Sequence, residues 1–415
     1  MTTTLAPDTI AHSPGDLLTR RQRLSYVLML GALVALGPFT VDLYLPAFPQ
    51  VAAELQATDA AIQLTLTATM IGFGLGQLVV GPLSDALGRK RPLLAATALH
   101  IVASIFVSFA PTVELVMAGR VLQGIGAAGG GVVAVAIVRD LFAGQRLIRM
   151  LANLALVTGL APVLAPVIGS QLLRVMDWRG VFVALAGYGI VMVLVAGLLL
   201  VETMPETKRG TFTVSATAGR YKKLLGDKVF VGVAIVGSMA FTALFAYLSS
   251  SSFVLQDIFG LSPQEYGLVF GMNSVGLVIA NQTSARVMKW FPPRAVATAG
   301  LAVMATGSVL LLVAGLLDLG LIGVLIPLFF VVASLGIIGP AVQITALKDH
   351  AGEAGTAASL LGALNFGVAG IVSPVVGVLG VSVVSMAVVM IGALTVAHLV
   401  FWIVVRPRME TTVVA

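Results

Sequence analysis

Two ionisable residues stand where an apolar chain is expected to carry no charge. Asp42 follows a stretch from Leu24 to Thr40 that contains no charged residue, and Arg120 lies inside another apolar stretch. An ionised side chain at the centre of a bilayer costs at least about 2.5–3.5 kcal/mol on insertion scales. Each of the two charges therefore requires a partner or a function.

Proton transfer is the chemistry that such a pair can perform. Burial favours the neutral form of a carboxyl group and a nearby cation favours its ionised form, so an aspartate in alternating surroundings takes up and releases a proton. The helical rise places Asp42 about 27 Å beyond Leu24 and Arg120 about 9 Å from the outer end of its own segment, which predicts similar depths in the outer half of a membrane. The alternative is that Asp42 caps its helix at the interface while Arg120 extends outward to water.

A second group of charges occupies the hairpin GPLSDALGRKRP, residues 81–92. An acid stands near a predicted helix end, three cations follow it, and two glycines are expected to permit tight turns. The simpler interpretation is that the cations only mark the cytoplasmic side of a membrane, but this leaves the acid and the glycines unexplained. We therefore predict a charged latch that breaks and re-forms between two halves of the protein. Its members are Gly81, Asp85, Gly88, Arg89, Lys90, Arg139 and Asp140.

Twelve apolar segments, each about 20 residues long and so able to cross a bilayer, must position these side chains. The 415 residues are 58% hydrophobic and 10% charged, with a mean hydropathy of +1.04, whereas a soluble domain carries about 25% charged residues. We therefore predict an all-α membrane protein. The segments run approximately over 24–46, 61–83, 92–111, 114–137, 147–173, 180–203, 228–250, 265–287, 294–316, 320–345, 354–377 and 380–405.

Composition excludes several classes of function. The chain has no cysteine, which rules out disulfides, thiolate metal sites and cysteine nucleophiles, and its four histidines lack metal-ligand spacing. We find no nucleophile–base pair and no metal cluster at membrane depth, and no segment long enough for a soluble effector domain. The sequence predicts neither an enzyme nor a cofactor nor a nucleic-acid partner. His100 and His398 are expected to serve helix packing or the interface rather than proton relay.

The distribution of positive charge predicts the orientation of the chain. If the N-terminus is cytoplasmic, 21 of the 24 lysines and arginines fall on the cytoplasmic side, as the positive-inside rule requires. The polar and basic segment 204–227 then becomes a cytoplasmic linker. It separates an N-terminal six-helix bundle (1–203) from a C-terminal six-helix bundle (228–415), and both termini are cytoplasmic.

The two halves share a pattern of small and polar residues at an offset near 200. Two six-span repeats around a site at the midplane are typical of alternating-access carriers. The matching positions are Gly76 and Gly276, Ser84 and Ser284, Arg89 and Lys289, Gly159 and Gly367, Pro166 and Pro374, and Gly169 and Gly377.

The 81–92 hairpin resembles the signature loop of the major facilitator superfamily, and further segments resemble its Bcr/CflA branch of drug:proton antiporters. The resemblance covers nearly the whole chain. It implies a bacterial inner-membrane exporter of antibiotics and related small molecules, driven by proton influx, and we expect a monomer. The segments are VDLYLPAFP (41–49), QLTLTATMIGFGLGQLVVGPLSDALGRK (63–90), RVLQGIGAA (120–128), IVRDLF (137–142), WRGVF (178–182), SFVLQDIFGLSPQEYGLVFGMNSVG (252–276) and AGTAASLLGALNFG (354–367).

The resemblance also implies roles for individual residues. Arg120 matches the single arginine of the family's fourth-helix motif, which is implicated in proton coupling, and Asp42 matches the acid of its first helix. TGLAPVLAPVIGS (158–170) resembles the antiporter motif of the fifth helix, although its prolines could equally serve only to kink the helix. Three departures from the usual glycines keep metabolite export or symport open as an alternative. The motif residues are Gly159, Pro162, Pro166 and Gly169, and the departures are Ala161, Ala165 and Ser170.

Polar and aromatic residues inside the predicted spans are candidates for the walls of a substrate cavity. Small-molecule sites combine apolar walls with a few polar groups, although polar groups in membrane bundles more commonly bridge helices. The expected partners are a small-molecule substrate, protons and the lipid bilayer, and the sequence does not identify the substrate. The candidates are Tyr44, Gln63, Gln123, Asn153, Phe241, Phe245, Asn273, Gln343 and Asn365.

Overall fold

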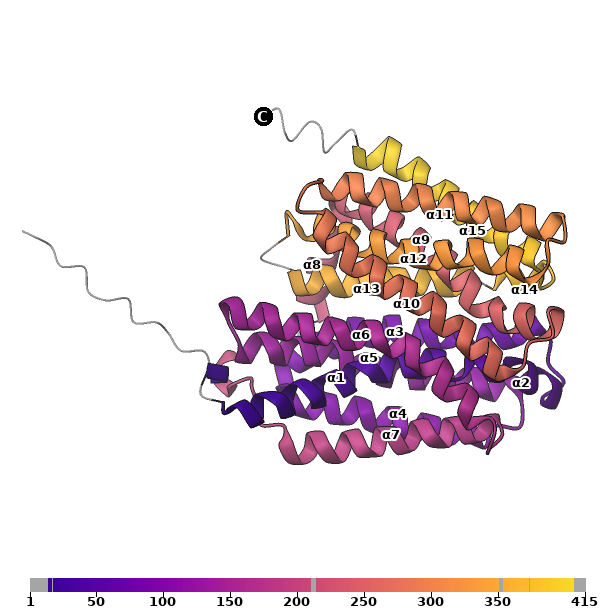
Figure 1. The fold of residues 1–415 in the computed structure, drawn as a ribbon. Coiled ribbons are helices and arrows are strands. Elements are labelled where there is room, and N and C mark those ends of the chain that lie inside the picture. Colours follow the sequence, from indigo (N-terminus) through magenta and orange to yellow (C-terminus); the bar gives the residue numbers. More distant parts are fainter. Residues whose placement is uncertain (1–13, 17, 210–213, 351–353, 373, 407–415) are drawn as a thin grey trace, which may run out of the picture.

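The structure is a computed structural model that describes residues 14–16, 18–209, 214–350, 354–372 and 374–406. Within these residues it is helical and contains no strand, and twelve helices have 18 residues or more (Figure 1). They are α1 (Arg20–Asp42), α3 (Asp59–Leu87), α4 (Lys90–Ser108), α5 (Val113–Leu141), α6 (Gly144–Leu172), α7 (Trp178–Leu199), α9 (Lys228–Phe253), α10 (Pro263–Val287), α11 (Pro293–Leu316), α12 (Gly320–Leu347), α13 (Ala354–Val372) and α15 (Val383–Val400).

Ten of these helices are long and apolar enough to cross a membrane, judged by length and composition. Of the other two, α10 carries polar residues such as Asn273 and Asn281, and α6 has a described apolar part over Gly159–Leu172. Large apolar side chains such as Leu28 and Leu198 remain exposed on the outside of the bundle. A surface of that kind is stable against lipid rather than water. The predicted all-α membrane fold is confirmed.

The same pattern of helix pairs occurs twice along the chain. In the first six helices α3 packs on α5 and α4 packs on α5 and α7, while in the last six α10 packs on α12 and α11 packs on α12 and α15. Figure 1 shows the two sets as two layers, the indigo-to-magenta set below the orange-to-yellow set. We refer to them as the first half and the second half. The halves meet where α3 packs on α13 and where α6 packs on α10.

Short helices mark the two ends of the bundle. Helix α8 (Val214–Gly226) lies at one end with the turn between α3 and α4, and we call this the linker end. Helices α2 (Phe48–Glu54) and α14 (Val375–Val378) lie at the other, the far end (Figure 1). The remaining short elements are η1 (Pro14–Asp16), η2 (Leu45–Ala47), η3 (Glu206–Lys208), η4 (Val254–Ile258) and η6 (Phe401–Val405).

One predicted segment ends earlier as an α-helix than the sequence predicts, and a proline explains its end. The α-helix of the predicted span 24–46 stops at Asp42, because Pro46 has no N–H to donate to the Asp42 carbonyl four residues earlier, and the chain continues as η2 and α2. Within the predicted span 354–377 the structure describes α13 up to Val372 and α14 from Val375 to Val378.

The glycines of the signature hairpin do not have equal roles. Helix α3 continues to Leu87, so Gly81 lies inside the helix against Val132 of α5 rather than in a tight turn as the sequence analysis expected. Gly88 forms the turn with φ +86°, a conformation that L side chains rarely adopt. A Cβ at Gly88 would also lie only 2.5 Å from a carboxylate oxygen of Glu202.

Candidate functional site

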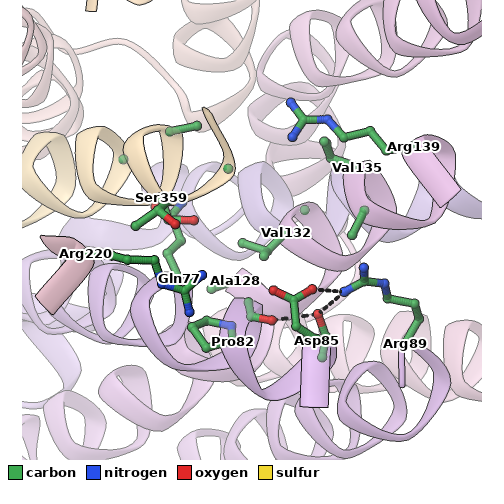
Figure 2. A pocket seen from close by; sticks show the side chains of 18 of the residues that line it. Gln77, Pro82, Asp85, Arg89, Ala128, Val132, Val135, Arg139, Arg220 and Ser359 are labelled. Carbon is green, nitrogen blue, oxygen red and sulfur yellow. Dashed lines mark hydrogen bonds and ion pairs between the residues drawn. The ribbon is translucent and has the colours of Figure 1, made fainter. Parts of the chain in front are cut away.

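A cavity of about 600 Å³ lies between the two halves at the linker end. Its walls come from α3 and α5 of the first half, from α13 of the second half and from the linker helix α8. Figure 2 shows it, with Asp85 and Arg89 at one side and Arg220 of α8 at another. The labelled lining residues are Gln77, Pro82, Asp85, Arg89, Ala128, Val132, Val135, Arg139, Arg220 and Ser359.

Three of the seven predicted latch residues, Asp85, Arg89 and Asp140, form an ion-pair network beside this cavity, and it lies within the first half rather than between the halves. Arg89 is paired with Asp85, one helical turn earlier, and its Nε lies 2.8 Å from Oδ2 of Asp140 at the end of α5. The guanidinium also donates to Ser84 Oγ at 3.0 Å. Burial lowers the pKa of Arg89, but the hydrogen bonds that it donates to Asp140 and Asp85, with the negative charges of these carboxylates, outweigh burial and leave this pKa above its ordinary value. Arg89 therefore stays charged and joins α3, α4 and α5.

The start of the interhelical linker is attached to the same hairpin. Glu202, just after α7, accepts hydrogen bonds from the backbone N–H groups of Arg89 at 2.8 Å and Lys90 at 3.2 Å. Burial raises the pKa of Glu202, but these bonds and one from the Met204 N–H lower it below its ordinary value overall. Thr203 donates to Asp140 Oδ2 at 3.0 Å.

Two members of the predicted latch set do something else. Lys90 donates from Nζ to the carbonyl of Gly197 at 2.8 Å, where a cation is favourable at the C-terminal end of α7. Arg139 is exposed and lines the cavity, and in Figure 2 its guanidinium lies apart from the Asp85–Arg89 pair. The structure thus brings Asp85, Arg89 and Asp140 together and leaves Arg139 outside their network.

Inside the first half, a closed ring of hydrogen bonds links α1, α4 and α5. Arg120 Nη1 donates to the backbone carbonyl of Thr40 and to Oε1 of Gln123, each at 2.7 Å. Gln123 Nε2 donates to Ser104 Oγ at 2.8 Å, and Ser104 Oγ donates to the carbonyl of His100 at 2.7 Å. His100 Nε2 lies 2.9 Å from Thr40 Oγ1, which closes the ring. All five side chains are fully buried.

Arg120 does not extend to water, so that alternative from the sequence is wrong. Its side chain is completely buried, and its guanidinium carbon lies 5.0 Å from the centre of the Tyr44 ring and 5.6 Å from that of Phe182. Rings at these distances attract a cation, and the attraction is stronger when water is absent. Three features therefore stabilise this buried charge: the carbonyl at the end of α1, the Gln123 amide and the two ring faces.

Asp42 is the last residue of α1 and is also buried, with 4% of its surface exposed. Its Oδ1 atom has no hydrogen-bond partner, and neither do Nε and Nη2 of Arg120. No ion pair joins Asp42 to Arg120 in the part of the chain that the structure describes, although each lies within electrostatic range of the other. Tyr247 of α9 and Tyr266 of α10 lie within the same range of Asp42 from the second half.

None of the nine residues predicted to line a substrate cavity lines the cavity at the linker end. Most of them connect helices instead. Gln63 accepts from the N–H of Gly377 across the halves, Asn273 donates to Tyr247, and Ser238 donates to Asn365. Gln123 belongs to the buried ring and Tyr44 packs against Arg120, whereas Asn153 and Gln343 are exposed.

Phe241 and Phe245 belong to an aromatic cluster that crosses the boundary between the halves. The ring of Phe366 on α13 lies 5.2 Å from that of Phe241 and 6.5 Å from that of Phe245. On its other side, Phe366 lies 4.9 Å from Phe73 of α3, which lines the cavity. The cluster therefore places apolar surface next to the cavity wall.

The proline-rich motif lies on α6 at the contact with α10. Because Pro166 has no N–H, the carbonyl of Pro162 loses its donor within the helix, and Ser274 Oγ of α10 lies 3.4 Å from it. Gly169 packs against the backbone of Leu43, since a Cβ there would lie 2.2 Å from the Leu43 carbonyl. Gly159 faces Val278 of α10. The motif therefore shapes a boundary between the halves.

Sequence reasoning missed several residues of these networks. His100 was expected only to serve helix packing or the interface, and its partner Thr40, 60 residues earlier in the chain, carries no motif. Glu202 stands at the end of a span, which hides its role as an acceptor for the hairpin 113 residues earlier. One signal was available for His100: a histidine in an apolar helix requires a partner.

Known proteins resemble this chain in sequence and in structure. The sequence profile described as Major Facilitator Superfamily matches residues 28–374. An uncharacterized MFS-type transporter, YdgK of Bacillus subtilis, is 33% identical over 85% of this chain and 87% of its own. The bicyclomycin resistance protein homolog of Haemophilus influenzae is 30% identical over 83% of this chain and 87% of its own. The multidrug resistance protein MdtL of Escherichia coli is 30% identical over 69% and 70%.

A solved structure with the same fold is that of the xylose transporter XylE from E. coli, in a partially occluded inward open conformation. It superimposes with a TM-score of 0.71, covers 91% of this chain and 97% of its own, and is 14% identical. At this identity the likeness concerns the fold alone.

Proposed function

The chain belongs to the major facilitator superfamily, and we propose that it is a proton-coupled exporter of small drug-like or antibiotic molecules that works by alternating access. The family and the transporters of like fold indicate a membrane transporter rather than an enzyme. Relatives named for bicyclomycin resistance and multidrug resistance favour drug export. Three further parts of the function are proposed below: coupling to protons, export as the direction of transport, and Asp42 and Arg120 as the residues that couple proton movement to transport.

The distribution of contacts between the halves supports alternating access. At the far end, Gln256 donates to the carbonyl of Pro46 at 3.1 Å and Gln264 donates to that of Ser170 at 2.8 Å, so the second half is joined there to η2 and to α6. At the linker end a cavity lies between the halves instead. We infer that the structure represents the state that faces the linker end.

One observation supports proton coupling above all: polar atoms of Arg120 and Asp42 lack hydrogen-bond partners and have the geometry to bind each other. Nε and Nη2 together form the side edge of a guanidinium, which can bind a carboxylate through two parallel hydrogen bonds. Both atoms are free, and so is Oδ1 of Asp42. In our proposal Asp42 holds a proton while it is apart from this edge and releases the proton when a change of conformation brings the carboxylate onto it.

A direct test reconstitutes the purified protein in vesicles and imposes a pH gradient of each sign, with bicyclomycin as the probe and a susceptibility panel in a pump-deficient host to find other substrates. An exporter coupled to protons accumulates substrate only when protons run the other way. Substrate accumulation in the same direction as proton flow would indicate symport. Substrate accumulation that does not depend on the pH gradient would refute proton coupling.

The orientation is a separate part of the proposal: both termini and residues 204–227 in the cytoplasm of a bacterial inner-membrane protein that functions as a monomer. The chain has no cysteine, so a single introduced cysteine can be labelled without background from native cysteines. A cysteine at Lys222, exposed on α8, should be protected from an impermeant reagent added to intact cells, whereas one at Asp318, exposed between α11 and α12, should react. The opposite pattern would reverse the orientation.

A further inference from the structure

The buried ring fixes the protonation pattern of His100. Thr40 Oγ1 has one hydrogen, and it donates this to the carbonyl of Leu36 at 2.6 Å. The contact of 2.9 Å between Thr40 Oγ1 and His100 Nε2 can therefore be a hydrogen bond only if Nε2 is the donor. His100 thus carries its hydrogen on Nε2, and Nδ1 is the bare nitrogen without a partner.

The ring also determines which part of Arg120 remains available. Thr40 lies in the last turn of α1, where carbonyl groups lack a donor within the helix, and Arg120 Nη1 supplies one. Gln123 accepts the second hydrogen of Nη1. With Nη1 fully used, the guanidinium is held with its Nε–Nη2 edge free.

We propose that His100 is a positioning residue for proton coupling: by donating to Thr40 it holds the end of α1 against Arg120 and so presents the free guanidinium edge to Asp42. This inference rests on the proposed function of Asp42 and Arg120. A glycine of α5 permits the close helix contact that this geometry requires. A Cβ at Gly126 of α5 would lie 2.6 Å from the backbone nitrogen of His100, so α4 and α5 approach closely where the ring forms.

His100 acts here by orientation and not by carrying the proton itself. The atom that would accept a proton, Nδ1, has no hydrogen-bond partner, and it faces Gly189 of α7, 3.4 Å from the place of a Cβ there. The cation that faces His100 is Arg120 of α5, and it disfavours a second positive charge.

The groups within electrostatic range of Asp42 come from three elements. They are Arg120 of α5, Tyr247 of α9 and Tyr266 of α10. Arg120 alone among them carries a positive charge. The pH at which Asp42 exchanges its proton should therefore depend most strongly on how Arg120 is held, and so on His100.

The experiment measures the pH midpoint of Asp42 by infrared titration of the purified full chain, with the carboxyl band identified by its loss in Asp42→Asn. His100→Leu removes the donor, and Thr40→Val removes the acceptor with an isosteric side chain. His100→Gln keeps a donor near the position of Nε2 but has no imidazole. Thr97→Val is the matched control, because Thr97 is buried on α4 and its hydroxyl bonds only to its own helix, at the carbonyl of Leu93.

We expect His100→Leu and Thr40→Val to move the midpoint to higher pH by about one unit, a tenfold change in proton affinity. The double variant should shift no further than either single one, because both remove the same bond. His100→Gln and Thr97→Val should keep the midpoint of the unmodified protein. If His100→Leu does not fold, Thr40→Val with its Thr97→Val control decides the question.

Two results would overturn the inference. An unchanged midpoint in Thr40→Val would show that the bond does not position Arg120, and a full shift in His100→Gln would show that the imidazole matters for more than its donor. Failure of the underlying function looks different: the carboxyl band would then persist in Asp42→Asn, and Asp42 would not be the titrating group.

Discussion

The two halves of this protein share an arrangement of helices, but only the first half buries charged residues among those that the structure describes. In the first half, Asp42, Arg89 and Arg120 are buried charged residues, whereas the buried polar residues described in the second half are serines, threonine and asparagine. The second half instead contributes Phe241, Phe245 and Phe366 to its boundary with the first.

The hairpins at the linker end differ in the same way. Ser84 of the first half receives a hydrogen bond from Arg89, which is paired with Asp85. The equivalent Ser284 donates to the carbonyl of Ile337, and the position equivalent to Asp85 is Ala285. A repeated scaffold therefore requires only one copy of the charged machinery, and a second copy would add the insertion cost of further charges.

Among the variants that test this difference between the halves, Asp42→Asn should have the largest effect. The variant keeps the size of the side chain and removes its titration, so accumulation driven by a pH gradient should fall to the level seen without a gradient. Vesicle transport of bicyclomycin measures this. The matched control is Asp257→Asn, an acid at the far end of the second half. Equal losses in both variants would refute the assignment of coupling to the first half.

Arg120→Leu should affect stability as well as coupling. The carbonyl of Thr40 and the amide oxygen of Gln123 lose their donor, and a buried polar group without a partner costs about 1–3 kcal/mol. Thermal unfolding in detergent should show the loss. Arg120→Lys should recover part of the coupling, because it supplies a charge without the two-atom edge. Full recovery by lysine would argue against the proposed carboxylate contact.

Phe366→Ala tests the apolar contribution of the second half. The ring contacts three other aromatic rings, and such pairs contribute about 0.5–1.5 kcal/mol each. The substrate concentration for half-maximal transport should rise about tenfold, which corresponds to about 1.4 kcal/mol, while the pH dependence stays unchanged. Phe330→Ala, at an exposed aromatic ring on α12, is the control. A shift of the pH profile in Phe366→Ala would mean that the division of roles is wrong.

The two acids of the latch should differ in effect. The Asp140 side chain is 18% exposed and that of Asp85 is 58% exposed, and exposed ion pairs contribute about 0–1 kcal/mol. Asp140→Asn should therefore slow transport several-fold, and Asp85→Asn should do so less, with normal abundance in the membrane for both. Transport at the wild-type rate in the two variants would remove the latch from the mechanism.

The smallest expected effect belongs to Glu202→Gln. The pKa of Glu202 lies below its ordinary value of 4.5 in the folded protein. Its stabilising effect is therefore complete above about pH 4.5 and is lost as the pH falls through the lower folded value. Acidification through this range should lower the unfolding temperature of the unmodified protein slightly more than that of Glu202→Gln. Parallel curves would show that Glu202 does not stabilise the hairpin by its charge.

The sequence by itself determined the class of fold and the charged residues that require explanation. Apolar segments of bilayer length leave few alternatives to a helical membrane bundle, and a charge within such a segment is conspicuous because its insertion is costly. Asp42, Arg120 and the Asp85–Arg89 pair could therefore be found from the chain alone. The signature motifs in addition indicated the family.

Tertiary structure decided which atoms meet. The hydrogen bond between Thr40 and His100 and that between Arg89 and Glu202 join residues far apart in the chain, and no local pattern encodes such pairs. The cavity illustrates the same limit: Gln77, Arg139 and Ser359 line it because α3, α5 and α13 converge there, whereas most of the polar residues predicted to line it bridge helices instead. A buried polar group must find a partner, and only the packing of the helices determines which partner lies within reach.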